Sequence, residues 1–535
     1  VESMRVPMHD ARALLLSELD VAANNWPADG WIAGQRVRFW LDQHDPTVAL
    51  SSANACNGEK WWCAALRGYV HGQNSEVRLA EVAFREMHAA MTVAQRCAWD
   101  DVRELLPASE RNAYTALSCA ARVNTNAKLW WLSDPLYRIP GNERQVEQEL
   151  RRVEIALHSA LDQDERYSWS DKFGGDALRT LVMRYGWPGY TGWGGEYIDD
   201  DHTDYLETRN SPRASPYTTF EYSIDRARLL PSWTAVASPF NAPETSWVLT
   251  NDNIQGQPFT EWWPVEHFRT PRRLLILPEG QHAMMRRDSL VRIAATVTLG
   301  HRLLRDGAPL DVMFVSTTGA QQLDSLSRRS IRAGTVGVMQ GMIPSVPAVI
   351  GIEALGIGGR LADARARFGV TPPPTLGAMR PGEIAVSDPV LLDVQGGKLN
   401  IDKPSEALLD QMLNTTHLEG ANRRVGVYWE TYGVSPSDTV KVSVRVATDQ
   451  QLSGMRKLGI ALNVASNPNS EVVQSWTEPD PSKSTQTVFG RIPVTSRAIL
   501  LNLSLLQSDT YVLEVSVERK DGTIATGRRR ITIDR

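Results

Sequence analysis

The sequence has little of what marks membrane-spanning or nucleic-acid-binding proteins. No stretch approaches the about 20 consecutive apolar residues that a membrane-spanning helix requires. Positive charge is not in excess, because the net charge is −5, whereas a general nucleic-acid binder usually carries a basic surface. We therefore expect no transmembrane segment in this chain and no nucleic-acid partner.

Cysteine is also scarce: four of 535 residues, all between positions 56 and 119. The spacings, Cys56-x6-Cys63 and Cys97-x21-Cys119, match no zinc or haem motif. An even number in one small region fits two disulfides, and among the three connectivities we choose Cys56–Cys63 and Cys97–Cys119; four free buried thiols are the alternative. Because disulfides form in oxidising compartments, we expect a periplasmic or extracellular protein. A cleaved export signal would explain why the sequence begins with Val1, as would a trimmed end.

Motifs of catalysis and cofactor binding are missing as well. The sequence contains no His-Glu-x-x-His, no Gly-x-Ser-x-Gly and no phosphate-binding loop, and its ten histidines do not pair at helical spacing. The glycines at 356–359 lack the rest of a nucleotide-binding turn. The sequence therefore predicts no catalytic residue, no metal ligand and no cofactor. Because glycosidase-type carboxylate pairs leave no spacing to read, a hydrolytic enzyme stays open as an alternative.

Tryptophan, in contrast, is abundant. The 17 tryptophans outnumber the 13 tyrosines and the 10 phenylalanines, and several stand in adjacent pairs such as Trp61-Trp62 and Trp130-Trp131. Since buried aromatic residues mostly serve cores, we interpret these pairs as packing at helix junctions and domain seams in preference to a ligand-binding face.

Residues 1–120 are predicted to form an α-helical array stapled by the disulfides. Apolar residues recur at helical spacing, and two expected helices, 60–72 and 75–91, are joined by a short polar turn. Three residues of this pair occupy the small, small and aromatic positions of a tetratricopeptide repeat: Gly68, Ala80 and Phe84. Stacked helical pairs of this kind bind peptides or proteins on a concave face, and a plain scaffold is the alternative.

The most distinctive order of residues lies within 121–190. A tryptophan pair and Asp-Pro precede a Pro-Gly-Asn-Glu turn, an expected helix over 142–162, a Trp-Ser-Asp turn, and an expected strand over 178–185 ending in Tyr-Gly-Trp-Pro. Proline fixes φ and asparagine caps helices, so the first turn is expected to orient the helix against the tryptophan pair. The residues of this pattern are Trp131, Asp134, Pro135, Asn142, Glu143, Trp169, Asp171, Tyr185, Gly186 and Pro188.

This pattern resembles the GWxTD domain, a family of exported bacterial proteins that has no established activity. The resemblance covers about residues 115–190 and implies a small α/β unit in an exported bacterial protein, but it implies no reaction. The chain departs from the family pattern at two places. The Trp-Asp turn is one residue shorter, with Ser170 inside it, and Gly189 stands where the family has an aspartate.

Residues 191–270 are predicted to be a loop-rich connector with aromatic and acidic side chains. The acidic stretch offers oxygen ligands that suit a hard cation, but its spacing is not that of an EF-hand, so we favour a solvated loop. Long irregular segments often form binding surfaces. The candidate binding residues in and beside this region are Trp187, Trp193, Asp199, Asp201, Asp204, Trp262 and Trp263. The carboxylates considered for hydrolysis are Glu196, Asp199, Glu261 and Glu266.

Two antiparallel β-sandwich domains are expected at 271–400 and 420–535. The first shows short β-rich runs separated by turn residues, including a strand over 387–394. The second alternates clearly over 440–446, and its Asp521-Gly522 pair is a hairpin signal. About seven strands in the second domain resemble an immunoglobulin or fibronectin-type sandwich.

The sequence as a whole predicts a multidomain α+β protein: a helical array, a small α/β unit, a connector and two β-sandwiches. The function that we expect is that of a non-catalytic structural or adaptor protein outside the cytoplasm, which docks onto other proteins as a subunit of a cell-envelope assembly. The alternative is a carbohydrate-binding or hydrolytic protein that uses the region 187–266, because exposed tryptophans suit sugar faces.

Overall fold

The structure is a computed structural model, and the chain divides into two compact units, Val1–Leu275 and Ile276–Arg535. The residues that it describes are 2–106, 108–134, 136–159, 183, 265–267, 273–277, 280–299, 309–319, 322–332, 335–355, 363–394, 405–419, 424–435, 438–448, 471–478, 485–489 and 492–534.

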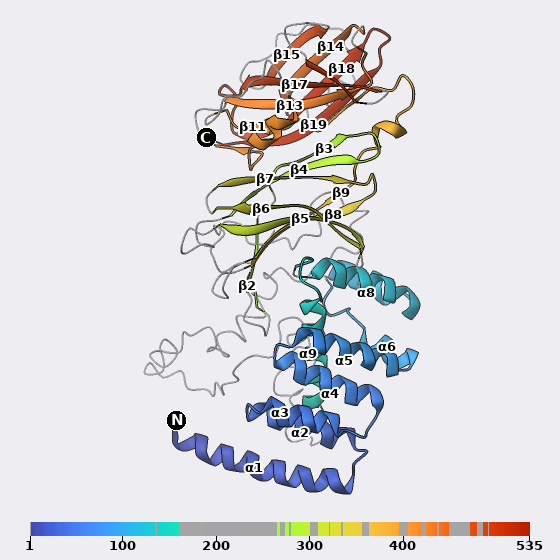
Figure 1. Cartoon of the computed structure of the whole chain (residues 1–535), viewed down its shortest axis with the longest axis vertical. Coiled ribbons are helices and arrows are strands. Elements are labelled where there is room, and N and C mark those ends of the chain that lie inside the picture. Colours follow the sequence, from blue (N-terminus) through green and yellow to red (C-terminus); the bar gives the residue numbers. More distant parts are fainter. Residues whose placement is uncertain are drawn as a thin grey trace. The chain divides into compact units, whose positions relative to one another are not determined.

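The first unit is helical in its described part up to residue 183, where the helices follow one another and stack side by side (Figure 1). The helices are α1 Glu2–Asn25, α2 Gly30–Asp42, α3 Pro46–Asn54, α4 Lys60–Gln73, α5 Val77–Ala90, α6 Val93–Trp99, α7 Ala108–Thr115, α8 Cys119–Ser133 and α9 Glu143–Ser159. None of the helices in the described part of the chain is long and apolar enough to cross a membrane.

Polar side chains set where these helices begin. Asp29 accepts hydrogen bonds from the first backbone N–H groups of α2, and Asp45 does the same for α3, in which Pro46 occupies the first turn. Thr92 and Gln95 form a reciprocal capping box at α6. Because each cap satisfies donors that the helix itself leaves unpaired, the segment boundaries follow from local sequence.

The core of the helical unit forms where α4 and α5 pack together and α9 lies against them. The apolar face of α9 presents Val146, Leu150, Val153 and Leu157, all buried. Its other face is polar yet also buried, and Arg151 there donates to the Glu147 carboxylate at 2.9 Å and to the carbonyl of Met183 at 3.2 Å. Met183 therefore packs on the polar face of α9.

Met183 is helical, so the strand predicted over 178–185 is wrong at that position. A short apolar run fits a buried helix as well as a buried strand, and periodicity does not separate the two. The helix predicted over 142–162 is present as α9, Glu143–Ser159.

The described strands form four sheets, which lie in the second unit except for the strand residues before Ile276. Most neighbouring strands pair antiparallel, whereas β12 and β19 are parallel. The first sheet has the order β1 (Val265–His267), β2 (Arg273–Ile276), β9 (Asp363–Val370), β8 (Ala348–Leu355), β5 (Leu310–Gly319) and β6 (Gln322–Ile331). The second comprises β3 (His282–Arg286), β4 (Val291–Thr298) and β7 (Val336–Ile343). The third comprises β10 (Ala385–Val386), β13 (Arg424–Tyr432), β17 (Ile492–Asn502) and β16 (Thr485–Phe489), with β11 (Val390–Leu392) also on β13. The fourth has the order β12 (His417–Leu418), β19 (Ile524–Ile533), β18 (Asp509–Arg519), β14 (Val440–Ala447) and β15 (Glu471–Glu478).

The third and fourth sheets enclose one hydrophobic core (Figure 1). Valines at alternate positions of β14 point into it, and on the facing sheet Val427 and Trp429 of β13 do the same. This alternation is the period-two pattern expected for strands with one buried face. The predicted turn at Asp521-Gly522 is present between β18 and β19, and Gly522 adopts a φ of 85°, which favours glycine.

The opposite face of the third sheet packs on the second sheet. Ala283, Met285 and Ala294 share a buried cluster with Tyr428 of β13 and residues of β11. Strand β13 is therefore buried on both faces. The strand predicted over 387–394 within the first sandwich is present as β11. It pairs with β13 and therefore belongs to the third sheet.

Candidate functional site

The structure pairs the four cysteines as Cys56–Cys63 and Cys97–Cys119, which is the connectivity chosen from the sequence. Both disulfides lie in the helical unit. The first joins the start of the loop that follows α3 to the first turn of α4, and the second joins α6 to the start of α8.

The tryptophan pair and the Pro-Gly-Asn-Glu turn of the predicted pattern are in contact. Asn142 donates from its side-chain amide to the Trp130 carbonyl at 2.7 Å, and its side-chain oxygen accepts from the Gln145 N–H at 2.9 Å, which caps α9. Trp131 and Glu143 are buried, and the Asp134 carboxylate accepts from the Leu136 N–H at 3.1 Å.

The other candidates lie outside the described residues. They are Pro135, Trp169, Asp171, Tyr185, Gly186, Trp187, Pro188, Trp193, Glu196, Asp199, Asp201, Asp204, Glu261, Trp262 and Trp263. Glu266 lies in β1, and its side chain is not described.

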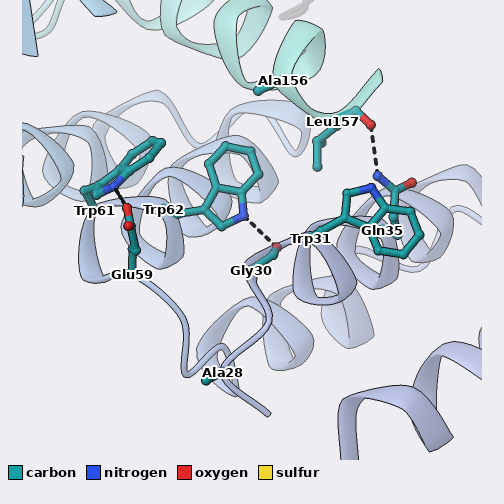
Figure 2. A pocket seen from close by; sticks show the side chains of 9 residues that line it. All are labelled: Ala28, Gly30, Trp31, Gln35, Glu59, Trp61, Trp62, Ala156 and Leu157. Carbon is teal, nitrogen blue, oxygen red and sulfur yellow. Dashed lines mark hydrogen bonds between the residues drawn. The ribbon is translucent and has the colours of Figure 1, made fainter. Parts of the chain in front are cut away.

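The described helices form an open, mainly apolar groove of about 380 Å³, which we call the tryptophan groove (Figure 2). Three tryptophans give it its character: Trp31 from α2 and the adjacent Trp61 and Trp62 from α4. It is lined by Ala28, Gly30, Trp31, Gln35, Glu59, Trp61, Trp62, Ala156 and Leu157. Trp31 keeps 43% of its surface exposed, so part of this aromatic surface is available to another molecule.

Hydrogen bonds fix the groove's side chains (Figure 2). Trp62 donates from Nε1 to the Gly30 carbonyl at 2.7 Å, and Trp61 donates from Nε1 to the Glu59 carboxylate. A Cβ at Gly30 would come within 2.9 Å of the Trp62 ring, so glycine is what lets this ring lie on the start of α2. The Trp pair predicted to be junction packing does pack here, but it also lines an open groove.

Gln35 is the buried polar residue of the groove. Its Nε2 donates to the Leu157 carbonyl at 2.9 Å and so ties α2 to α9. Its Oε1 is buried and accepts no hydrogen bond. A buried amide oxygen without a donor carries a free-energy cost.

The Cys56–Cys63 disulfide holds the rim of the groove. The segment that it closes contains Glu59, Trp61 and Trp62. A crosslink over so short a loop limits the conformations open to these three residues even when neighbouring helices fluctuate.

Aromatic contacts connect the groove to a cluster of three ionisable side chains. Trp61 meets Trp99 edge-on with ring centroids 5.7 Å apart, and Trp99 Nε1 donates to Glu149 Oε2 at 2.6 Å. The other oxygen of Glu149 lies 3.0 Å from His88 Nε2, while Asp100 Oδ1 lies 3.6 Å from His88 Nδ1. We call His88, Asp100 and Glu149 the His88 cluster.

The pKa values of all three residues of the His88 cluster are shifted from their ordinary values. Burial disfavours the charged imidazole, but the hydrogen bond to Glu149 and the charges of Glu149 and Asp100 outweigh it, so the pKa of His88 is raised. Burial likewise acts against ionised Glu149, yet the contacts with His88 and the charge of Arg152 lower the pKa of this carboxyl group. Burial raises the pKa of Asp100.

The His88 cluster is the one group of three potential metal ligands among the residues that the structure describes. The two carboxylates, however, face opposite nitrogens of the imidazole ring. One ligand atom of each residue lies within 4.8 Å of the other two, but each carboxylate is nearest to a different ring nitrogen, whereas metal sites gather their ligands around a single point. Arg152 adds a further positive charge nearby. The arrangement therefore suits a proton on His88 better than a metal ion.

The β unit holds a second polar cluster, which is closed to solvent. Arg287 donates to both oxygens of Glu430, at 2.8 and 3.0 Å, and Glu430 is 1% exposed. The hydroxyl groups of Tyr428 and Tyr432 also donate to this carboxylate, at 3.0 and 2.9 Å. Burial and the charge of Glu430 raise the pKa of both tyrosines. Because no ligand reaches it, we assign this cluster to the packing of β13.

Comparison of the chain with protein-family models and with curated proteins finds no match. Among solved structures, the chain is similar to a tetra-tandem repeat from the extending region of a large adhesion protein, with 13% identity and a TM-score of 0.14. It is also similar to red sea bream transglutaminase, with 8% identity and a TM-score of 0.13. These matches cover 49% and 48% of this chain and 48% and 32% of those chains, respectively. TM-scores this low support no argument about function.

Proposed function

We propose that this protein is a non-catalytic, exported adaptor, a GWxTD-like envelope component, and that its helical unit binds a segment of a partner protein in the tryptophan groove. The observation that carries the proposal is the partly exposed Trp31 beside Trp61 and Trp62, with the Glu59 carboxylate at the edge of the same groove. Open aromatic surface next to a carboxylate is typical of a recognition site.

The partner segment is proposed to carry a lysine or arginine side chain. Tryptophan faces attract cations, and the Glu59 carboxylate provides the complementary charge. Glu59 is exposed and lines the groove, so its carboxylate is the acceptor that such a side chain reaches. The long apolar stem of lysine or arginine fits between tryptophans while its charged end reaches the acceptors.

The two disulfides support an oxidising location, periplasmic or extracellular. In this proposal α2, α4 and α9 line the groove, and α4 is the first helix of the tetratricopeptide-like pair α4–α5. The immunoglobulin-like sheets of the second unit provide a second rigid body for assembly in the envelope.

Fluorescence anisotropy with two labelled peptides tests the proposal, one with three lysines and one with three glutamates in the same neutral background. We expect the full chain to bind the lysine peptide and not the glutamate peptide. Trp31→Ala and Glu59→Gln are each expected to weaken binding at least about fivefold, in line with the loss of one cation–aromatic or charge contact.

Trp26→Ala is the matched control, because Trp26 is an exposed tryptophan of the same unit that does not line the groove. Equal binding of both peptides, or equal loss in the control, contradicts the proposal. Binding of neutral oligosaccharides in place of the lysine peptide would support the carbohydrate-binding alternative.

A further inference from the structure

The His88 cluster joins three helices at one point. His88 lies in the last turn of α5, Asp100 is the residue that ends α6, and Glu149 comes from the middle of α9. His88 lies between the two carboxylates, one at each ring nitrogen. A protonated imidazole attracts both carboxylates by its charge and carries an N–H toward each, whereas a neutral imidazole has no net charge and only one N–H.

The same cluster is connected to the tryptophan groove by direct contacts. Glu149 accepts from Trp99, whose ring meets Trp61, and the rings of Trp61 and Trp62 are 5.6 Å apart. Helix α9, which carries Glu149, also contributes Leu157 to the groove and binds Gln35 through it.

The charges around His88 favour its protonated form. Asp100 of α6 and Glu149 of α9 face the ring, and the cations nearby are Arg96 of α6 and Arg152 of α9. When His88 is protonated, the buried Glu149 has a charged donor from α5 and another cation, Arg152, on its own helix. When the proton leaves, the hydrogen bond of His88 with Glu149 loses its charge assistance, and the charge attraction between His88 and Asp100 at 3.6 Å is lost.

We propose that the proton on His88 acts as a latch that holds Trp99 and, through it, the Trp61–Trp62 side of the groove, so that binding in the groove weakens when His88 is deprotonated. This regulation rests on the docking function proposed above. It makes the protein a stronger binder while His88 is protonated and a weaker one once the pH rises past the pKa of His88, which the neighbouring carboxylates hold above the ordinary histidine value of about 6.5.

Hydrogen–deuterium exchange of the full chain, read by mass spectrometry, tests the latch without any ligand. Residues 59–66 and 93–100 are followed from about pH 5.5 to about pH 8.5, a range that spans histidine titration, and residues 440–447 serve as the internal reference. Comparing each variant with the unmodified chain at the same pH cancels the intrinsic dependence of exchange on pH.

At low pH we expect exchange in both segments to be at least about fivefold slower in the unmodified chain than in His88→Gln, and this difference is expected to vanish at high pH. Asp100→Asn keeps the His88–Glu149 contact but removes a charge that stabilises the proton, so protection is expected to be lost at a lower pH. His71→Gln, a histidine of α4 paired with Glu76, is the control and is expected to match the unmodified chain. A difference that is absent, or equal at every pH, overturns the latch.

The lysine peptide is then titrated at the same pH values. Loss of affinity at high pH in the unmodified chain but not in His88→Gln supports regulation of the groove. Binding that is independent of pH overturns the latch and leaves the docking function standing. Exchange that responds to His88 protonation while no peptide binds at any pH overturns the docking function and leaves the latch standing.

Discussion

At the scale of single residues, Arg287 and Glu430 form a buried ion pair of the β unit. Glu430 lies on the face of β13 that packs against the second sheet, and its carboxylate accepts hydrogen bonds from Arg287, Tyr428 and Tyr432. A buried carboxylate persists only when such donors and an opposite charge compensate for its lost hydration.

Replacing Arg287 with methionine keeps similar bulk but leaves the Glu430 carboxylate buried without its cation. We expect the free energy of unfolding of the β unit to fall by about 3–5 kcal/mol, because breaking one side of a buried ion pair costs about that much. Urea denaturation followed by circular dichroism measures the change. Arg328→Gln, which removes an exposed pair with Asp311, is the control and is expected to leave stability unchanged. A small loss in Arg287→Met would mean that the tyrosine hydroxyl groups suffice to hold the carboxylate.

Some of the contacts described above join residues that are close in the sequence and can be predicted from it. Others join residues that are far apart in the sequence and depend on packing. The disulfide pairing of Cys56 with Cys63 could be chosen because the two lie close in sequence. The His88 cluster could not be found in this way, because His88 and Glu149 are 61 residues apart and only the packing of α5 on α9 brings them together. In the groove, the pair Trp61-Trp62 was visible in the sequence, whereas no signal linked it to Trp31 or Leu157.

At the scale of elements, glycines set how closely α4 approaches its neighbours. A Cβ at Gly68 would lie 2.7 Å from the Phe84 ring of α5, and one at Gly72 would lie 2.4 Å from Leu150 of α9. Distances that short are not tolerated without movement, so both helices touch the backbone of α4 directly. This explains physically why the small and aromatic positions noted at Gly68 and Phe84 face each other.

Gly68→Val therefore forces α4 and α5 apart. We expect a loss of about 1–3 kcal/mol in the stability of the helical unit, the usual effect of overpacking a core. Thermal unfolding monitored at 222 nm gives the value. In a Phe84→Ala background the added methyl groups have room, so Gly68→Val should cost at least about 1 kcal/mol less there than in the unmodified chain. Additive effects of the two substitutions would show that the two side chains do not compete for the same space.

Helix starts and alternating strands were readable from sequence, whereas polar strands were not. Asp45-Pro46 marks the start of α3 by local capping alone, and β14 follows from its alternating valines. The sequence does not indicate strand β9, because Arg365 and Arg367 are buried together with the apolar residues beside them. A strand buried in this way does not show the alternation of buried apolar and exposed polar residues by which a half-exposed strand is predicted. Strand β6 was missed because its sequence, QLDSLSRRSI, is polar on both faces. Tertiary pairing, not local preference, decides such strands.

At the scale of the whole molecule, the two units are stabilised by different means. The helical unit carries all four cysteines of the chain in two disulfides, and the β unit contains none. The β unit instead buries apolar residues between its stacked sheets and fixes β13 with hydrogen bonds on both sides. A reducing agent therefore acts on one unit and leaves the chemistry of the other unchanged.

We expect differential scanning calorimetry of the full chain to show two transitions, of which reduction lowers only the one that belongs to the helical unit. Each disulfide is expected to contribute about 2–4 kcal/mol, so removing both lowers that transition by about 10 °C or more. The double variant Cys56→Ser with Cys63→Ser should reproduce part of the shift without reductant, and Gly68→Val should move the same transition, which assigns it to the helical unit. Arg287→Met should move only the other. A single transition that shifts as a whole under reduction would mean that the units unfold cooperatively, because loss of the disulfides would then be felt by every sheet of the β unit.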